Sequence, residues 1–571
     1  LSADLDLGTS FTNVPGGTAT WTFTDSTGNY NDDTGTAAIV ITKADAVVVV
    51  TPYTNASTTY NGLPHTATVT SISGVNGETG ATVGSVDVSN TTHTNAGTYA
   101  SDTWTFTGTA NYANIAATTI TDSISPASLS ITADANIGTP AVDAFGKVYD
   151  GAVFSPFTAR YSGFVNGETP LVLTGTLAFS GAGTSAVSAG GPYAVTPGGL
   201  TSTNYAITFV AGSLTIAKAN TTTTITSDAP DSSVVAQTYT VTWTVTLVSP
   251  GGGTLTGNVT VTGDGTCTAA VGAGQCDLTS TSAGAKTLTA TYGGGANFNS
   301  SSDTETHQVN TRATTTTVVC DPMAQKVGLN VLCTATVTDI ETNGPKSPPQ
   351  GIVTFSKAAA DLGSFVGSAT CQLSPTVTTG TTNNCSVQYT SLTPTVDAIS
   401  ASYAGNTTHL SSANPATLAV LVAFYDPSGG FVTGGGWINS PTGAYRPNPN
   451  LTGRANFGFV SKYLKGATIP TGQTEFQFQV GNLNFHSEVY QWLVVSSNGT
   501  KAQYKGTGTI NGAGNFGFLL TAWDGSPDRF RIKIWDKNNG DAVVYDNNFT
   551  SPDDIDTQPM AIAGGSIVIH K

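Results

Sequence analysis

The stretch "TYTVTWTVTLV" (238–248) alternates polar and apolar residues without a break. A period of two predicts a β-strand that buries one face and exposes the other. Thr and Val favour strands, whereas Gly and Asn favour turns, and these residues dominate the whole chain. The stretch therefore predicts an all-β protein built from short strands separated by tight turns.

The size and composition of the chain predict several similar domains. It has 571 residues, of which 10% are charged and 65 are Gly. A typical domain holds roughly 100–150 residues, so four to six domains are expected. Units of roughly 80–110 residues with about seven strands are typical of immunoglobulin-like sandwiches. We therefore predict tandem immunoglobulin-like β-sandwich domains in a linear array, with a distinct C-terminal β-sandwich or barrel domain.

Internal repeats set the expected domain boundaries. "TWTFT" occurs at 20–24 and 103–107, and "VNGET" occurs at 75–79 and 165–169. "TTTTITS" (221–227) is matched by "TTTTVVC" (314–320), which marks a second type of unit. The first unit lacks the counterpart of its front strands. The expected domains are 1–46 (partial), 47–127, 128–219, 220–310, 311–423 and 424–571.

The repeated "VNGET" raises the question of a duplicated carboxylate site. Glu78 and Glu168 lie in separate units, so they cannot form the close carboxylate pair of a glycosidase. Asn-Gly is the favoured two-residue hairpin turn because both positions tolerate positive φ. We therefore expect the two glutamates to be exposed flanks of turns.

The six cysteines fall in three close pairs and predict disulfides. A second-type unit pairs Cys267 with Cys276, and the next pairs Cys371 with Cys385 at corresponding positions, each bond stapling one hairpin. Cys320 and Cys333 form an additional pair in the later unit. Zinc is the alternative, but no His lies near in sequence and there is no C-x-x-C. An even cysteine count in an all-β chain with few charges favours disulfides and an oxidising compartment.

Charge narrows the range of partners. The net charge is −16, and residues 1–423 carry all of it, with 9 Lys+Arg against 25 Asp+Glu. This balance argues against nucleic acid or an anionic membrane surface as a partner. The longest apolar runs fall short of the ~20 residues that a spanning helix needs, so no membrane span is expected.

Three groups of motifs resemble known bacterial repeats. "YNG" (60–62), "YDG" (149–151) and "VNGET" in residues 47–219 resemble the MBG-type repeats of bacterial surface proteins. Residues 220–423, with "TYGGGANF" (291–298), resemble bacterial Ig-like repeats. Residues 424–571, with "FVTGGGWI" and a final "GGSIVIHK", resemble a C-terminal module of secreted bacterial repeat proteins. The resemblance implies an extracellular, cell-surface location and a role as a stalk or adhesin.

Candidate sites for chemistry are sparse. The six histidines are scattered over different domains, and neither G-x-S-x-G nor H-E-x-x-H occurs. No enzymatic activity and no cofactor are expected. Calcium is a candidate metal for the last domain, because carboxylates on its turns offer oxygen ligands. Its candidate ligands are Asp524, Asp528, Asp536 and Asp541.

Exposed tryptophans could bind sugar rings in the last domain. Trp437 sits beside glycines, and Trp535 lies on the polar face of the alternating "RFRIKIW" (529–535). We expect Trp492 and Trp523 to belong to the core. Glycan binding through Trp437 and Trp535 is therefore a hypothesis, with core packing as the alternative.

These observations predict a non-enzymatic extracellular stalk or adhesin that spaces and presents a C-terminal interaction domain. Its partner would be a cell-surface or extracellular matrix component, such as a glycan. One alternative is a filament subunit that self-associates when a strand from another chain completes residues 1–46. Another alternative is a carbohydrate-binding appendage of a larger secreted protein.

Overall fold

The computed structural model describes residues 3–571 and is built from β-strands. Its contacts divide it into two units, Leu1–Thr222 with Thr246–Gly257 and Gly293–Ser301, and Thr223–Val245 with Asn258–Tyr292 and Ser302–Lys571. Within the described residues the helical segments are all single 3-10 turns: η1 (Gly80–Thr82), η2 (Ser89–Thr91), η3 (Pro170–Val172), η4 (Ala182–Thr184), η5 (Val271–Ala273), η6 (Ala416–Leu418) and η7 (Gln479–Gly481). The fold is therefore all-β, as predicted.

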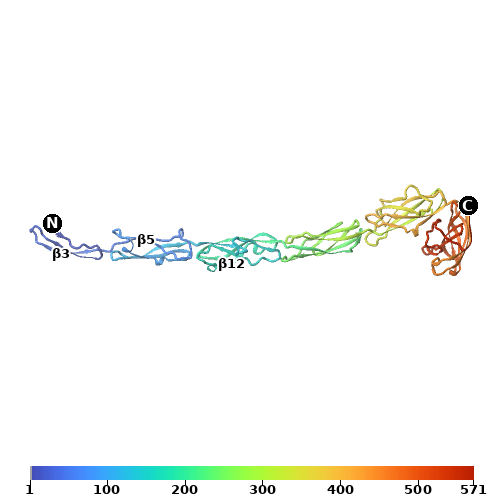
Figure 1. Cartoon of the computed structure of the whole chain (residues 1–571). Coiled ribbons are helices and arrows are strands. Elements are labelled where there is room, and N and C mark those ends of the chain that lie inside the picture. The colour runs from blue at the N-terminus through green and yellow to red at the C-terminus, as the bar shows by residue number, and fades with distance from the viewer. Residues whose placement is uncertain (1–2) are drawn as a thin grey trace. The chain divides into compact units, whose positions relative to one another are not determined.

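Residues 1–46 contain a single small sheet with the order β1-β2-β3. Its strands are β1 (Leu5–Asp6), β2 (Gly16–Phe23) and β3 (Asp33–Val40), and β3 is labelled in Figure 1. Within this segment Ala19 is the buried hydrophobic residue, while Tyr30 and Val40 are 68% and 77% exposed. This sheet has no second layer among the described residues of the segment.

Residues 47–127 form two small sheets, β4-β5 and β6-β7-β8 (Figure 1). Trp104 and Phe106, from the repeated "TWTFT", pack with Val83 and Tyr112 in the core between them. The alternation of that pentapeptide therefore buries its two aromatic residues, as a period of two requires. The strands are β4 (Val47–Thr51), β5 (Thr68–Ser73), β6 (Gly84–Asp87), β7 (Gly97–Gly108) and β8 (Ile115–Ile124).

Residues 128–219 again form two sheets, β10-β15-β13-β12 and β11-β9-β14. Leu129 and Ile131 on β9 are buried in one hydrophobic cluster, and Leu214 and Ile216 on β15 are buried in another. The strands are β9 (Ala127–Ala133), β10 (Phe145–Val148), β11 (Ala159–Ser162), β12 (Thr174–Ser180), β13 (Gly190–Thr201), β14 (Tyr205–Val210) and β15 (Gly212–Ala217).

The segments 220–310 and 311–423 share one topology. The three-stranded sheet β16-β18-β21 corresponds to β24-β26-β30, and β17-β23-β22-β19-β20 corresponds to β25-β33-β31-β27-β29. The stretch at 238–248 forms β18, with Tyr239, Val241 and Trp243 buried on one face, so the predicted alternation is confirmed.

The strands of the first of these segments are β16 (Thr221–Ala229), β17 (Ser233–Val234), β18 (Thr238–Leu247), β19 (Asn258–Thr262), β20 (Thr266–Ala270), β21 (Gln275–Thr279), β22 (Gly284–Tyr292) and β23 (Ser301–Asn310). Those of the second are β24 (Thr314–Asp321), β25 (Ala324–Lys326), β26 (Asn330–Asp339), β27 (Gly351–Lys357), β28 (Ser364–Phe365), β29 (Thr370–Leu373), β30 (Thr382–Thr390), β31 (Thr395–Tyr403), β32 (Ser412–Ala413) and β33 (Val420–Tyr425).

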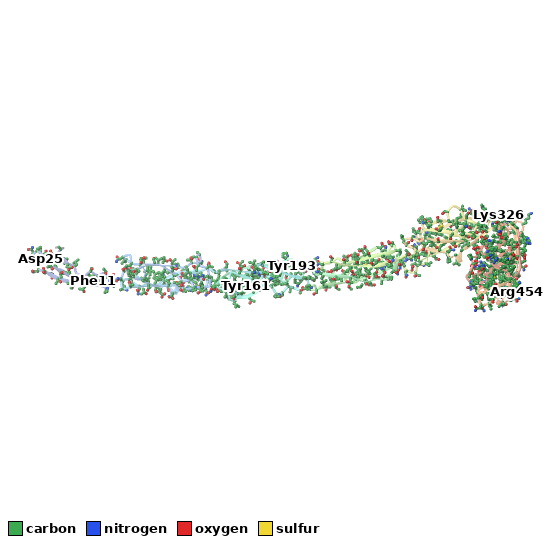
Figure 2. All side chains as sticks on the ribbon, in the orientation of Figure 1. Phe11, Asp25, Tyr161, Tyr193, Lys326 and Arg454 are labelled. Atoms are coloured by element: carbon green, nitrogen blue, oxygen red, sulfur yellow. A yellow bond between two sulfur atoms is a disulfide. The ribbon has the colours of Figure 1, made fainter. Side chains whose placement is uncertain are left out.

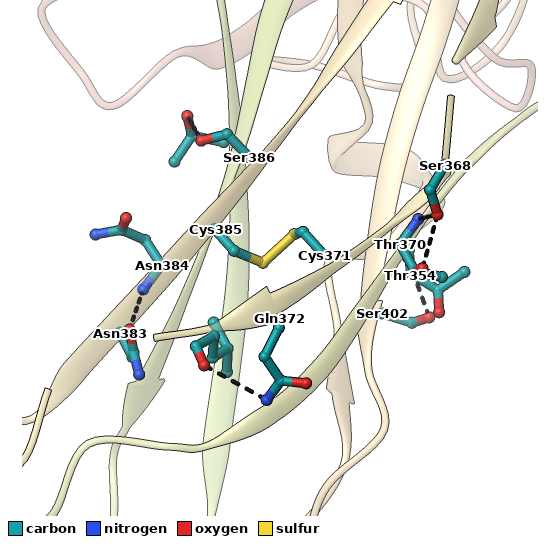
Figure 3. Close-up of a disulfide and its surroundings, with 12 residues drawn as sticks. Thr354, Ser368, Thr370, Cys371, Gln372, Asn383, Asn384, Cys385, Ser386 and Ser402 are labelled. Carbon is teal, nitrogen blue, oxygen red and sulfur yellow. Dashed lines mark hydrogen bonds between the residues drawn. A yellow bond between two sulfur atoms is a disulfide. The ribbon is translucent and has the colours of Figure 1, made fainter. Parts of the chain in front are cut away.

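All six cysteines form the predicted disulfides, Cys267–Cys276, Cys320–Cys333 and Cys371–Cys385. The expectation that Cys267–Cys276 and Cys371–Cys385 would each staple one hairpin is wrong, whereas the additional bond Cys320–Cys333 joins residues that lie directly opposite each other on β24 and β26. The other two bonds join strands of different sheets, β20 to β21 and β29 to β30 (Figure 3). They therefore tie the two layers of each sandwich together.

Residues 424–571 form one ten-stranded sheet with the order β41-β40-β39-β38-β37-β36-β35-β34-β43, and β42 pairs with β40. Phe457 on β35 stacks on Phe530 on β40 at 3.9 Å, although four strands separate them in the sheet. One sheet curls around one core here, instead of two stacked sheets. The strands are β34 (Phe431–Ser440), β35 (Gly453–Lys462), β36 (Thr471–Phe478), β37 (Leu483–Val495), β38 (Lys501–Ile510), β39 (Ala513–Trp523), β40 (Arg529–Asp536), β41 (Ala542–Asp546), β42 (Met560–Ala561) and β43 (Gly564–His570).

Candidate functional site: the joints between domains

An asparagine connects each of the first domains to the next. Asn204 Oδ1 accepts a hydrogen bond from the backbone N–H of Ala96 at 2.9 Å, and Asn204 Nδ2 donates to Asn95 Oδ1 at 3.1 Å. The backbone carbonyl of Asn204 also accepts from Ala127, at the start of β9. Asn is suited to this position because its side chain carries both an acceptor and donors. We call this set of contacts a joint.

The same joint recurs on both sides of this one within the first unit. Asn111 Oδ1 accepts from Val14 N–H at 2.9 Å, and Asn111 Nδ2 donates to Asn13 Oδ1 at 2.7 Å. Asn297 Oδ1 accepts from Ala189 N–H at 2.9 Å. The three asparagines lie in "ANY", "TNY" and "ANF", so an aromatic residue always follows. One local sequence therefore forms the same interdomain contact three times.

The glutamates of "VNGET" belong to these joints. Glu168 accepts hydrogen bonds from the hydroxyl of Tyr60, at 2.5 Å, and from that of Tyr205. Tyr60 comes from the preceding domain, whereas Tyr205 directly follows the joint asparagine. Glu78 accepts from Tyr112 in the same way. Both glutamates are half-buried, so the prediction of exposed turn flanks is wrong, because tyrosines that pack nearby cover them.

The joint raises the pKa of Tyr60 and packs its ring against a second tyrosine. Burial, and then the hydrogen bond to Glu168, raise the pKa of Tyr60 to about 12. The Tyr60 ring packs edge-on against Tyr205 with ring centroids 5.5 Å apart. The next joint repeats that contact, with Tyr149 of "YDG" edge-on against Phe298 at 5.4 Å. The "YNG" and "YDG" segments therefore place an aromatic ring at two successive joints.

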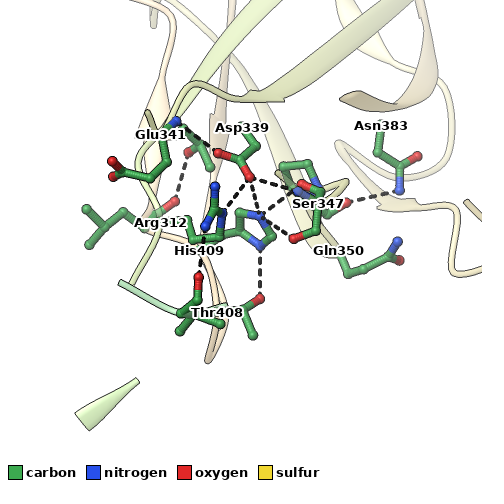
Figure 4. Close-up of polar contacts among 12 residues, drawn as sticks. Arg312, Asp339, Glu341, Ser347, Gln350, Asn383, Thr408 and His409 are labelled. Atoms are coloured by element: carbon green, nitrogen blue, oxygen red, sulfur yellow. Dashed lines mark hydrogen bonds and ion pairs between the residues drawn. The ribbon is translucent and has the colours of Figure 1, made fainter. Parts of the chain in front are cut away.

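A buried ion pair replaces the aromatic contact in the second unit. The backbones of Arg312 and His409 form an isolated parallel β-bridge, and those of Ala219 and Phe298 form the same kind of bridge in the first unit. Arg312 is fully buried, and its guanidinium donates to Asp339 at 2.7 Å and to the carbonyl of Val235 at 2.8 Å (Figure 4). The carbonyl belongs to the preceding domain, so this side chain connects segment 220–310 to segment 311–423.

The charge states of this network follow from its contacts. Burial opposes ionisation of Asp339, but hydrogen bonds from Arg312 and from the N–H groups of Ser347 and Glu341 outweigh it and lower its pKa. Burial lowers the pKa of His409, which disfavours its charged form. The network is therefore an Arg–Asp ion pair beside a His whose neutral form is favoured.

The last sandwich packs on the outer face of the C-terminal sheet. Val396, Ala423 and Tyr425 form one buried cluster with Trp492 and Leu519. Trp492 is therefore buried as predicted, but it lies at this interface and outside the main core of its own domain. Trp523 is half-buried, and its indole N–H donates to the carbonyl of Ile555.

An open cleft of about 610 Å³ lies beside this interface. Lys326 (Figure 2) and Tyr425 line it from the last sandwich, and Lys465 lines it from a loop of the C-terminal domain. Its volume is within the range of roughly 300–1,000 Å³ that is usual for small-molecule sites. No local sequence pattern predicts this cleft, because its walls come from segments about 40–140 residues apart.

The two tryptophans proposed for glycan binding are both half-buried. Trp437 lies against Gly564, and the guanidinium of Arg454, which is labelled in Figure 2, lies 4.6 Å from its ring centroid. Trp535 lies against Gly517 on β39, with the ammonium group of Lys505 5.5 Å from its ring centroid. The structure does not bring the two indoles into one site: Trp437 is on β34 and Trp535 on β40, at separate positions in the sheet order.

The four candidate calcium ligands have other partners or stand apart. Asp524 and Asp528 accept hydrogen bonds from the N–H groups of Ile569 and Ile567, on edge strand β43. These bonds connect the β39–β40 turn to the other end of the sheet. Asp536 accepts from the N–H of Asn538, and Asp541 is exposed. Among the described residues, no three of these four carboxylates converge within 4.8 Å.

Comparison with protein families identifies one domain. Residues 129–215 match the family model of the MBG domain (YGX type). The MBG-type resemblance is therefore confirmed for the domain expected at 128–219. No curated protein is similar to the chain.

Several solved structures resemble the chain at low identity. The D00–D0 domain of intimin is 16% identical over 36% of this chain and 100% of its own, with a TM-score of 0.15. Invasin, a bacterial integrin-binding protein, is 12% identical over 57% of this chain and 78% of its own, with a TM-score of 0.24. FdeC, an Escherichia coli adhesin, is 13% identical over 62% and 96%, with a TM-score of 0.16. Within the described residues, no helix is long and apolar enough to cross a membrane.

Proposed function

We propose that this chain is part of a non-enzymatic extracellular surface protein, in which tandem sandwiches space and present a C-terminal interaction domain. The observation that carries the proposal is the repeated joint. Three asparagines form the same hydrogen bonds to the preceding domain. A spacer needs its domains to keep a fixed relation to one another, and repeated polar joints supply that fixation.

The strength of a joint can be approximated from its bonds. Each hydrogen bond contributes roughly 0.5–1.5 kcal/mol net, and the aromatic pair adds roughly 0.5–1.5 kcal/mol. A joint such as that of Asn204, with two side-chain hydrogen bonds and one edge-on ring pair, is therefore stabilised by about 2–4 kcal/mol. This is sufficient to favour one relative arrangement over a freely hinged pair.

Small-angle X-ray scattering on the full chain tests this spacing role. The triple variant Asn111→Ala, Asn204→Ala, Asn297→Ala removes the side-chain bonds at all three joints. We expect a broader distribution of interatomic distances than in the wild type. Asn76→Ala, which changes an exposed residue of the first "VNGET", is the control and should match the wild type. Identical scattering from the triple variant and the wild type would refute the spacing role of the joints.

Ligand binding would occur at the C-terminal end of the proposed stalk. The cleft lined by Lys326, Tyr425 and Lys465 combines two cations with an aromatic ring, which suits a surface glycan that carries an acidic group. A glycan array probed with the full chain would test this, with Lys326→Ala plus Lys465→Ala as the variant. Binding that survives both substitutions would place the ligand elsewhere.

A second candidate function is assembly into a filament. It is favoured by the single sheet of residues 3–46, which leaves Tyr30 and Val40 largely exposed. A strand from another copy could pair with an edge of that sheet. Analytical ultracentrifugation over a range of concentrations would distinguish the two candidates, because a filament subunit grows with concentration and a stalk does not.

A further inference from the structure

Three side chains of the segment 220–310 converge on one point. Asp228 lies near the end of β16, Asp231 in the turn that follows, and His307 on β23. Their ligand atoms all lie within 4.8 Å of one another. The chain brings them together across a sequence separation of 79 residues between Asp228 and His307.

The distances already match the spacing of ligands around a small ion. His307 Nδ1 lies 2.9 Å from Asp228 Oδ2 and 3.6 Å from Asp231 Oδ1. Zinc is bound at roughly 2.0–2.2 Å by His nitrogen and carboxylate oxygen, so two of its ligands lie roughly 3–3.5 Å apart. An ion could therefore be bound with side-chain shifts of a few tenths of an ångström.

The histidine is held in the orientation that a ligand requires. Its Nε2 lies 2.8 Å from Ser233 Oγ, and its ring stacks on Tyr239 with centroids 3.8 Å apart. A metal-binding His usually donates its other N–H to a neighbouring polar group, which fixes the ring. Here that group is Ser233, so Nδ1 is directed towards the two carboxylates.

The three side chains differ in burial, so that the site is protected on one side and open to solvent on the other. His307 is fully buried and Asp228 is 7% exposed, whereas the side chain of Asp231 is 47% exposed. Asp231 therefore forms the solvent side of the site. A metal could enter past it and retain water in its remaining position.

The homologous segment 311–423 provides an internal comparison. In the first segment the N–H of Val235 donates to the carbonyl of Asn310, and in the second the N–H of Val327 donates to the carbonyl of Tyr425. In this register Val422 stands where the first segment has His307. Asp321 matches Asp228 in the aligned "TTTT" strands. One segment thus has the imidazole ligand and the other does not, although the fold is the same.

We propose that Asp228, Asp231 and His307 bind a divalent transition-metal ion, for which zinc is the best fit. One imidazole and two carboxylates are a borderline ligand set that suits zinc better than calcium, which prefers six to eight oxygens. Three protein ligands leave a fourth position for water. Binding requires Nδ1 without a proton, so a proton bound there is released to solvent as the ion enters.

Zinc content of the full chain provides the test. The chelator-treated protein is dialysed against Zn²⁺, and bound metal is measured by mass spectrometry alongside a competition titration for affinity. We expect about one zinc per chain. Asp231→Asn should weaken binding at least tenfold, because it removes a charged ligand from the exposed side, where folding is least affected. Asp277→Asn, on an exposed face of the same segment, is the matched control and should bind like the wild type.

A second measurement separates this site from the other histidines. Co²⁺ bound to imidazole and carboxylates in a tetrahedral site gives visible absorption bands, which Asp231→Asn should abolish and Asp277→Asn should leave. A wild-type chain that retains no zinc would overturn the proposal, and Asp228–His307 would then be an ion pair alone. Equal zinc binding by Asp231→Asn and the wild type would overturn it as well.

Discussion

Asp361 is buried in the last sandwich beside a second buried carboxylate. It is 4% exposed, and its Oδ2 accepts hydrogen bonds from the N–H groups of Ala358 and Ala398. Its Oδ1 has no partner among the described residues. Asp397 nearby is fully buried and accepts from the Tyr389 hydroxyl at 2.7 Å. Burial first, and the charge of Asp397 second, raise the pKa of Asp361 to about 7.

This shift makes the stability of the sandwich depend on pH. The folded state binds the proton more tightly than the unfolded chain, in which the pKa is 3.8. The contribution of protonated Asp361 to the free energy of unfolding is therefore fully present below about pH 4 and falls as the pH rises towards 7. Above that pH this contribution no longer changes. Three pKa units correspond to roughly 4 kcal/mol, and local relaxation reduces this to an expected loss of roughly 2–4 kcal/mol.

Asp361→Asn tests the reasoning by removing the titration while preserving the shape of the side chain. In calorimetry of the full chain at pH 8, we expect one transition to rise by roughly 5–15 °C relative to the wild type, since 1 kcal/mol shifts a domain of this size by several degrees. At pH 4 the two proteins should melt together. The control is Asp321→Asn, which replaces an exposed aspartate of the same sandwich and should leave the temperature of the transition unchanged at pH 8. A variant that melts at or below the wild-type temperature at pH 8 would refute the argument.

Three further substitutions test the structure. Arg312→Met leaves a buried carboxylate without its ion-pair partner and should destabilise its sandwich by about 3–5 kcal/mol, seen as faster amide hydrogen exchange; unchanged exchange would contradict the ion pair. Gly517→Ala places a Cβ 2.2 Å from the Trp535 ring and should cost about 1–3 kcal/mol, measured by denaturant unfolding followed by tryptophan fluorescence. Replacing Cys320 and Cys333 by Ser should cost roughly 2–4 kcal/mol, detected as a lower calorimetric transition; an unchanged transition would mean that this bond contributes nothing.

The elements that repeat along the chain could be predicted from the sequence. The alternation at 238–248 gave β18 directly, because a period of two depends only on local geometry. Two of the three disulfide pairs followed from two units with cysteines at corresponding positions, and the third followed from the close spacing of the remaining two cysteines. What the sequence could not show was that two of these bonds cross from one sheet to the other, because sheet membership depends on long-range pairing.

The candidate sites were harder to predict because their partners lie far apart in sequence. The sequence indicated that Glu168 is an exposed turn residue, yet its hydrogen-bond donors Tyr60 and Tyr205 lie 108 and 37 residues away. A signal was present, since both "VNGET" segments are followed by an "NY" pair. Asp528 looked like a metal ligand on a turn, but the curling of the sheet brings it to the backbone of β43. Curvature of that kind has no local sequence pattern.

The joints also determine how such a chain can change in length. Each domain of the first type carries one half of a joint at each end. In the domain 47–127 these are Asn95 and Ala96 at one end and Asn111 with Tyr112 at the other. A unit inserted or deleted by recombination would therefore meet compatible neighbours without further substitutions. The segments 220–310 and 311–423 could not be exchanged in this way, because the ion pair of Arg312 connects them in place of the asparagine and aromatic contacts. Duplication within the first type would lengthen the protein in whole-domain steps and leave the C-terminal region unaltered.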